Sequence, residues 1–316
     1  MVEKRKIVLV GTGFVGMSMA YSLLNQGGAD ELVLIDINKD KTVGEAMDLS
    51  HGLPFAPSKM EIYAGEYKDC KDANIVVITA GLAQKPDQTR LDLARENAKI
   101  IKDITTQVVE SGFNGIFLVA SNPVDLMTYV VKKVSGFPAS RVIGSGTVLD
   151  TARLRYLISE YLSVSSKNIH AYIMGEHGDS SFVPWTHCYV GSKSLLQIMK
   201  ERGETEEQLN KIYQGVRDAA YEIIKLKKAT YYAIGISLTR IIKAILNNEN
   251  SILTVSTYLQ GEYGIKDVYI GVPTLINNKG VTDILTLPLT KEEQEKLENS
   301  ANILKEMIKT SINDII

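Results

Sequence analysis

The sequence is poor in cysteine and in long apolar runs, and each shortage excludes a class of protein. Its 316 residues include two cysteines, Cys70 and Cys188, which have no partner at the spacing of a metal site. A disulfide scaffold and a metal centre are therefore not expected. The apolar run near the N-terminus is too short for a signal peptide, and no stretch approaches the roughly eighteen apolar residues of a membrane span. These shortages predict a cytoplasmic protein without a membrane partner.

An excess of charge of one sign is also missing. The chain has 35 basic and 37 acidic residues, a net charge of -2. Nucleic acids and anionic membranes reward a strong basic excess, so neither is expected as a partner. Hydrophobic residues make up 45% of the chain, which is enough for a large core or for two domains.

What the first half does contain is short apolar runs separated by helix-length segments. The runs are Lys6–Val10, Glu31–Ile35, Asn74–Thr79, Gly115–Ala120 and Arg141–Ile143. They are continuously apolar, which predicts strands with both faces buried. Strands alternating with helices predict right-handed crossovers and an open parallel sheet of the α/β class.

The second half has a different pattern, with helices predicted over 204–227 and 234–246. Residues 268–289 predict two strands around a turn at Asn278–Gly280. Thr290 followed by Glu293 predicts a capping box, and an apolar stripe follows it at Leu297, Ala301, Leu304, Ile308 and Ile312. We therefore expect a first domain over 1–148 and an α+β domain over 149–316.

A glycine-rich motif follows the first expected strand. Gly11, Gly13 and Gly16 match G-x-G-x-x-G ahead of a helical run, and Asp36 ends the second strand twenty residues after Gly16. The three glycines permit a tight turn, close approach of a pyrophosphate and close packing of helix on strand. A carboxylate at the position of Asp36 binds ribose hydroxyls and repels a 2′-phosphate. The motif predicts a doubly wound Rossmann domain that binds NAD as the cofactor.

A histidine in the segment MGEHGDSSFVPW, His177, is a candidate proton donor. Upstream, Asp150 and Arg153 are three residues apart, which places them on one face of a helix. Taken alone, a structural histidine and a surface ion pair are the better interpretations. Their occurrence beside a dinucleotide motif favours a catalytic set. Together they would provide a proton donor, a carboxylate partner that orients it, and an arginine that can clamp a substrate.

Nearly end to end, the sequence resembles the lactate and malate dehydrogenase family. The resemblance rests on VGTGFVG, ITAGLAQKPDQTRLDL, SNPVD, GSGTVLDTARLR, GEHGDSS, ATYYAIG and YIGVPTLIN, which occur in the family's order. It implies hydride transfer between NAD and a 2-hydroxy acid. The residues that it assigns are His177 as acid and base, Asp150 to orient it, Arg153 for the substrate carboxylate, Arg90 to polarise the carbonyl from a closing loop, Asn122 near substrate and nicotinamide, and Thr230 in the pocket wall.

Gln84 indicates whether the substrate carries a second carboxylate. The family's malate dehydrogenases carry arginine at this position, which pairs with a second substrate carboxylate. Neutral Gln84 would leave that group unpaired, at a cost on the order of several kcal/mol. The resemblance therefore implies pyruvate and L-lactate, with malate dehydrogenase as the alternative. The run Ser181–Trp185 departs from the usual pattern, which leaves larger 2-oxo acids open.

The resemblance also implies regulation. In bacterial lactate dehydrogenases activated by fructose 1,6-bisphosphate, an arginine and a histidine bind phosphate between subunits. Arg155 and His170 occupy these positions here. Arg155 is two residues beyond Arg153, about 200° around a helix, so the two side chains cannot enter the same pocket. We expect a homotetramer that this effector activates.

Two other classes compete with this interpretation. A metal- and NAD-dependent glycosidase shares the nucleotide domain but needs a cysteine–histidine metal pair, and the pair His187–Cys188 lies outside the motifs. A non-catalytic NAD-binding protein would lose no activity on substitution of His177.

Overall fold

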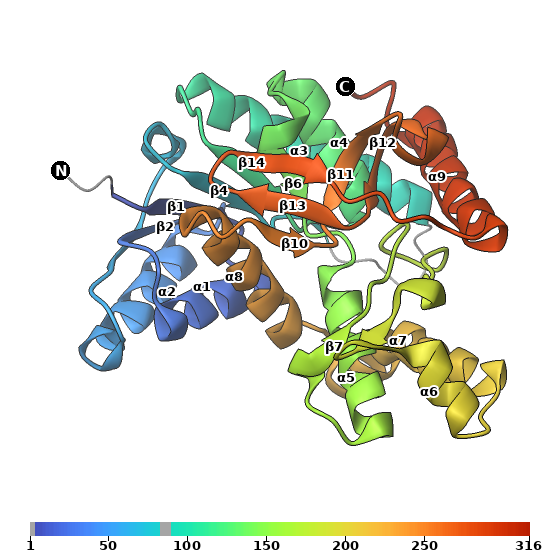
Figure 1. Ribbon diagram of the computed structural model, residues 1–316. Helices are drawn as coiled ribbons and strands as arrows, with labels where there is room; N and C mark the ends of the chain where they lie inside the picture. Colours follow the sequence, from blue (N-terminus) through green and yellow to red (C-terminus); the bar gives the residue numbers. More distant parts are fainter. Residues whose placement is uncertain (1–3, 83–89) are drawn as a thin grey trace.

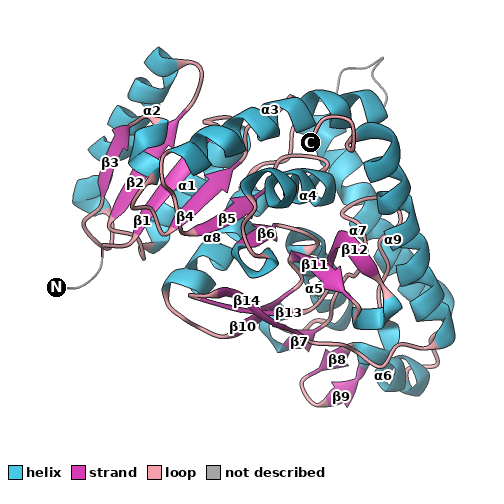
Figure 2. Cartoon of the chain, turned by 90° about the horizontal axis from the view of Figure 1, so that it is seen from above, coloured by secondary structure: helices cyan, strands magenta, loops and turns pink. Residues whose placement is uncertain are grey.

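The computed structural model describes residues 4–82 and 90–316, and its centre is an eight-stranded sheet (Figures 1 and 2). The sheet consists of β1 (Lys6–Val10), β2 (Glu31–Ile35), β3 (Glu61–Ala64), β4 (Ile75–Ile78), β5 (Ile116–Val119), β6 (Val142–Gly144), β11 (Ser256–Gln260) and β12 (Lys266–Gly271). Their order is β3-β2-β1-β4-β5-β6-β11-β12. The first six pair in parallel, and β11 pairs antiparallel with both β6 and β12. The predicted parallel sheet is confirmed.

Both faces of the parallel strands are buried, as the continuous apolar runs predict. All residues of β1, β2, β4, β5 and β6 are buried, and the five predicted strands lie within one residue of their observed ends. In β1, Val8 and Val10 contribute to one hydrophobic core, whereas Ile7 and Leu9 contribute to the other. Alternate side chains thus point into opposite cores.

Helices cover each face of the sheet (Figure 2). The helices of the described residues are α1 (Phe14–Gln26), α2 (Lys39–His51), α3 (Arg90–Glu110), α4 (Val124–Ser135), α5 (Val148–Leu162), α6 (Leu195–Glu201), α7 (Glu206–Lys227), α8 (Tyr232–Leu246) and α9 (Lys291–Ser311), of which α1, α2, α3, α4, α8 and α9 cover the sheet. Apolar residues of α1, α2 and α8 form one core with the sheet, and those of α3, α4 and α9 form the other. In this strand order the direction of winding reverses between β1 and β4, which is where ligands bind in such sheets.

The last helix confirms its predicted start and its apolar stripe. Thr290 Oγ1 accepts a hydrogen bond from the backbone N–H of Glu293 at 3.2 Å, and Glu293 Oε2 accepts one from Thr290 N at 2.9 Å. All five stripe residues are buried, and Ile308 is the most exposed of them at 6%. Helix α9 therefore packs on the body of the protein through that stripe.

The rest of the second half forms smaller units. A third core joins α5, α6 and α7 to the short strands β7 (Ile169–His170) and β8 (Tyr189–Val190), and β9 (Lys193–Ser194) pairs with β8. A separate three-stranded sheet contains β10 (Ser251–Leu253), β13 (Thr274–Asn277) and β14 (Gly280–Ile284), and β13 and β14 flank the predicted turn. Strands β11 and β12 belong to the eight-stranded sheet, and α8 and α9 pack on it. The division of the chain into two domains at residue 148 therefore remains a prediction.

Candidate active site

The glycine loop between β1 and α1 has the close contacts that its motif requires. Gly11 has φ +106°, and a Cβ there would lie 2.5 Å from the backbone N of Ala80. At Gly16 a Cβ would lie 2.1 Å from the backbone oxygen of Gly11. A Cβ on Gly13, by contrast, would meet no atom within 4 Å. The middle glycine therefore borders open space next to the N-terminus of α1, where a pyrophosphate fits.

Asp36 follows β2 and lies against this loop. Its Oδ2 accepts hydrogen bonds from Thr12 N at 2.7 Å and from Thr12 Oγ1 at 3.1 Å, and its Oδ1 accepts one from Asn38 N at 3.1 Å. Partial burial opposes the charged form, but these donors and nearby Lys41 outweigh it and lower the pKa of Asp36. The carboxylate is thus ionised beside the loop, as ribose binding requires.

His177, Asp150 and Arg153 form one hydrogen-bonded set. Asp150 is in the first turn of α5 and Arg153 is one turn later, with Arg153 Nη1 donating to Asp150 Oδ1 at 3.1 Å. His177 Nδ1 lies 2.7 Å from Asp150 Oδ2. The side chains of Asp150 and Arg153 are 13% and 14% exposed, and that of His177 is 29% exposed. The set is therefore sheltered, and the imidazole is its most accessible member.

The segment that carries His177 is fixed on both sides of the histidine. Met174 pairs with Phe182, and Gly175 pairs with Gly271 at the end of β12. Gly175 has φ +105°, a conformation that glycine adopts without strain. The histidine thus occupies a short loop held against the main sheet.

The charges in this set favour an imidazolium. The Asp150 carboxylate raises the pKa of His177 above its ordinary value, against the opposing effects of burial and of Arg153. Burial alone would raise the pKa of Asp150, but His177 and Arg153 reverse this effect and lower it. A carboxylate that stays ionised next to an imidazole of raised pKa is suited to an acid–base catalyst.

Two buried polar residues that the sequence reasoning did not select hold the backbone of predicted site residues, Asp125 at His177 and Asn97 at Asn122. Asp125, in the first turn of α4, is 3% exposed and accepts a hydrogen bond from the backbone N of His177 at 2.9 Å. Asn97, on α3 and 1% exposed, accepts from Leu82 N and donates to Asn122 O, both at 2.8 Å. The signal available for Asp125 was an acidic residue inside the apolar segment VDLMTYVV.

The other predicted residues are less closely connected. Asn122 is exposed just before α4, and Thr230 is half-buried between α7 and α8. Within the described part of the chain, neither hydrogen-bonds to the set around His177. Gln84 lies outside the described residues, as does the side chain of Arg90. Arg90 itself begins α3, whereas the sequence placed it in the preceding loop.

Arg155 and His170 lie on the other side of α5 from the catalytic set. Arg155 Nε donates to the backbone oxygen of Ala171 at 3.1 Å, and its guanidinium lies 5.7 Å from the centre of the Tyr172 ring. Burial lowers the pKa of Arg155. His170 is exposed on β7, next to Ala171. The two arginines of α5 thus have different partners, as the helix geometry predicts.

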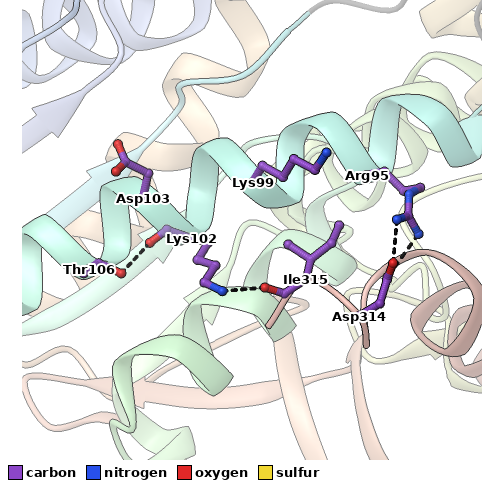
Figure 3. Close-up of a pocket in the computed structure, with 7 residues that line it drawn as sticks. All are labelled: Arg95, Lys99, Lys102, Asp103, Thr106, Asp314 and Ile315. Carbon is purple, nitrogen blue, oxygen red and sulfur yellow. Dashed lines mark hydrogen bonds and ion pairs between the residues drawn. The ribbon is translucent and has the colours of Figure 1, made fainter.

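A charged pocket lies where the C-terminus meets α3 (Figure 3). Arg95 donates to both carboxylate oxygens of Asp314, and Lys102 Nζ donates to the backbone oxygen of Ile315 at 2.6 Å. None of its lining residues belongs to the predicted site.

Over residues 4–82 and 90–316, no cluster of three potential metal ligands occurs, and no helix there has the length and apolarity to cross a membrane.

Comparisons with known proteins agree with this geometry. Residues 5–144 match the lactate/malate dehydrogenase NAD-binding domain, and residues 147–315 match the α/β C-terminal domain of the same family. L-lactate dehydrogenase 2 of Bacillus anthracis is 57% identical over 302 residues, covering 95% of this chain and 96% of the relative. The ligand-bound crystal structure of the minor L-lactate dehydrogenase of Enterococcus mundtii is similar with a TM-score of 0.96 and 50% identity, covering 98% of both chains. A lactate dehydrogenase from a Medee basin deep-sea metagenome library has a TM-score of 0.95 and 56% identity, covering 98% of this chain and 99% of the other.

Proposed function

This chain belongs to the lactate/malate dehydrogenase family, and we propose that it interconverts pyruvate and L-lactate with NAD(H). Family membership makes it an NAD(H)-dependent oxidoreductase. The observation that carries the proposal is the set of His177, Asp150 and Arg153, joined at 2.7 and 3.1 Å. It provides a proton donor, its orienting carboxylate and a substrate-binding cation in one sheltered place.

In this proposal each residue of the set has one task. Arg153 uses Nη1 for Asp150 and offers its remaining donors to the substrate carboxylate, which a planar guanidinium can bind at two points. Asp150 accepts the Nδ1–H of His177, which leaves the other ring nitrogen, Nε2, to carry the transferred proton. The cofactor supplies the hydride during reduction and accepts it during oxidation. We assign to Arg90 the polarisation of the ketone, and to Asn122 and Thr230 contacts with substrate.

The cofactor fit rests on the loop and on Asp36. The open space at Gly13 accommodates a pyrophosphate, and the ionised Asp36 suits ribose hydroxyls while repelling a 2′-phosphate. We therefore propose NAD rather than NADP. Its adenosine ribose would be held by Asp36, and its pyrophosphate by the backbone near Gly11, Gly13 and Gly16.

Substrate choice supplies the direct test. Rates with NADH against pyruvate, oxaloacetate, 2-oxobutyrate and 2-oxoisocaproate should show the highest kcat/KM for pyruvate. Gln84→Arg should change the ratio of oxaloacetate to pyruvate kcat/KM by on the order of 10²–10⁴ in favour of oxaloacetate, because a charge pair replaces an unpaired carboxylate. Gln88→Arg adds the same charge to the same segment and should leave the ratio unchanged. A native preference for oxaloacetate or for the branched acid would contradict the proposal.

We also propose that the chain forms a homotetramer in the cytoplasm. Large apolar side chains are exposed on α1 and α8, where Phe14 is 71%, Tyr21 63% and Tyr232 66% exposed. They line a groove of about 560 Å³ between the two helices. Exposed apolar patches of this kind mark protein interfaces, and a second copy of the chain is the occupant that we propose.

Effector activation is tested on the same assembly. We expect millimolar fructose 1,6-bisphosphate to lower the half-saturating pyruvate concentration by about 5- to 150-fold, the usual range of allosteric coupling. Arg155→Gln and His170→Ala should abolish this effect, whereas Lys167→Gln, which removes an exposed charge nearby, should not. Sedimentation velocity in the same solutions should give four chains. Saturation curves that superimpose with and without effector would contradict this part of the proposal.

A further inference from the structure

Asp125 is a buried carboxylate to which the proposed mechanism gives no task. Its side chain is held between three parts of the fold, since it belongs to α4, its Oδ2 accepts from the backbone N of His177 at 2.9 Å, and its Oδ1 accepts from the hydroxyl of Ser256 on β11. Asp125 is 3% exposed and Ser256 is fully buried. A buried carboxylate aimed at the backbone of a proton donor can affect that donor in two ways, by position and by charge.

The charged groups around Asp125 come from several elements. His177 and Glu176 face it from the loop, while Asp150 and Arg153 of α5 act on His177 itself. Burial raises the pKa of Asp125 to about 6, although the hydrogen bonds from Ser256 and from the backbone of His177 oppose the rise. At neutral pH the group is therefore mostly ionised, and its negative charge favours the protonated form of His177.

We propose that Asp125 is a positioning residue for proton transfer, which anchors the backbone of His177 and stabilises its imidazolium with a second negative charge. The inference rests on the proposed role of His177 as acid and base and adds a second carboxylate to it. Asp150 acts on the ring at Nδ1 and sets its tautomer. Asp125 acts at the backbone of the same residue and does not touch the ring.

Asp125→Asn separates charge from position. The amide oxygen can accept from His177 N, and the amide nitrogen can donate to Ser256 Oγ, which accepts as readily as it donates. The hydrogen bonds remain and only the charge is lost. Pyruvate reduction needs the imidazolium, so its rate falls as pH rises through the pKa of His177. Without the charge of Asp125 the pKa of His177 falls. The alkaline limb of the profile of kcat/KM against pH should therefore move to lower pH by about 0.5–1 unit.

The size of the effect follows from that shift. Well above the limb, kcat/KM should fall by about 3- to 10-fold, since one pH unit corresponds to a tenfold change in the protonated fraction. At about pH 5.5 the two enzymes should have similar rates, because His177 is protonated in both. Thr128→Val removes a buried hydroxyl from the same helix, one that donates to Val124 O, and it should leave the limb unchanged.

A second readout works without any substrate. Diethyl pyrocarbonate acylates only neutral imidazole, so its rate of reaction at His177, followed by peptide mass spectrometry against pH, reports the pKa of that residue. In Asp125→Asn the midpoint of this dependence on pH should move to lower pH by the same amount as the alkaline limb of kcat/KM. Because this assay needs no turnover of pyruvate, failure of the proposed function and failure of this inference are distinguishable.

Folding of the variant does not decide the question. If Asp125→Asn fails to fold, Ser256→Ala replaces it, because loss of the donated hydrogen bond raises the pKa of Asp125 and weakens its charge near neutral pH. That variant should shift the midpoint of His177 in the same direction but by less. A folded Asp125→Asn protein with the native midpoint, or a folded Ser256→Ala protein with the native midpoint, would overturn the inference.

Discussion

Replacement of His177 by asparagine is expected to reduce kcat for pyruvate reduction by on the order of 10²–10⁴, the usual contribution of a positioned general acid. Asparagine retains a side chain that can hydrogen-bond to Asp150 but has no proton to release near neutral pH. Arg153 remains in place, so KM for pyruvate should change much less than kcat. Steady-state kinetics with NADH at several pH values measure kcat and KM separately and so test this difference.

The control for this variant is His187→Asn. His187 lies ten residues later and hydrogen-bonds through Nδ1 to Thr186 Oγ1 at 2.8 Å, away from Asp150. The same substitution there should leave kcat unchanged. If His177→Asn retained the native kcat, the acid would have to be another group, and a non-catalytic role for the histidine would follow.

Asp150→Asn is expected to lower kcat by a similar factor, on the order of 10²–10⁴, although the side chain keeps its size and shape. Asp150 Oδ1 accepts from Arg153 and Oδ2 lies against His177 Nδ1. In asparagine one of these two atoms becomes an N–H donor. A donor facing the guanidinium would be repelled, so the amide nitrogen must face the ring and force Nδ1 to accept. A ring that accepts at Nδ1 is not an imidazolium.

The same variant should change the pH profile more than Asp125→Asn does. Asp150 is the main cause of the raised pKa of His177, and burial, which opposes the raised value, remains after the substitution. The alkaline limb of pyruvate reduction should therefore move to lower pH. Glu160→Gln removes an exposed carboxylate from the same helix and serves as the matched control. An unshifted limb in Asp150→Asn would contradict the assignment of this carboxylate.

The parts of the fold that the sequence predicted are those with a strong local pattern. β1, β2, β4, β5 and β6 are unbroken apolar runs because both of their faces are covered. β3 was missed because it is a half-buried strand at the edge of the sheet, where Glu61 is exposed and Tyr63 is only partly covered. The addition of β11 and β12 to the sheet depends on contacts between distant segments, which no local pattern contains.

In the site, as in the fold, local patterns predicted only the features formed by residues that are near one another in the sequence. The proximity of Asp150 and Arg153 followed from helix geometry, and the glycine loop followed from its motif and context. The pairing of His177 with Asp150 came from the family resemblance alone, since 27 residues separate them. Asp125 was overlooked because its partners lie 52 and 131 residues away in the chain.

Strand β11 is translated long after its neighbour β6, and this order has a consequence for folding during synthesis on the ribosome. When residue 144 has emerged, β6 presents an open edge with unpaired backbone groups, and the strand that covers it begins at Ser256. More than a third of the chain must still be translated before that edge closes. Open edges invite pairing with other chains. The edge of β6 is thus open to such pairing over this interval, and the residue that ends it, Ser256, also completes the anchorage of His177 through Asp125.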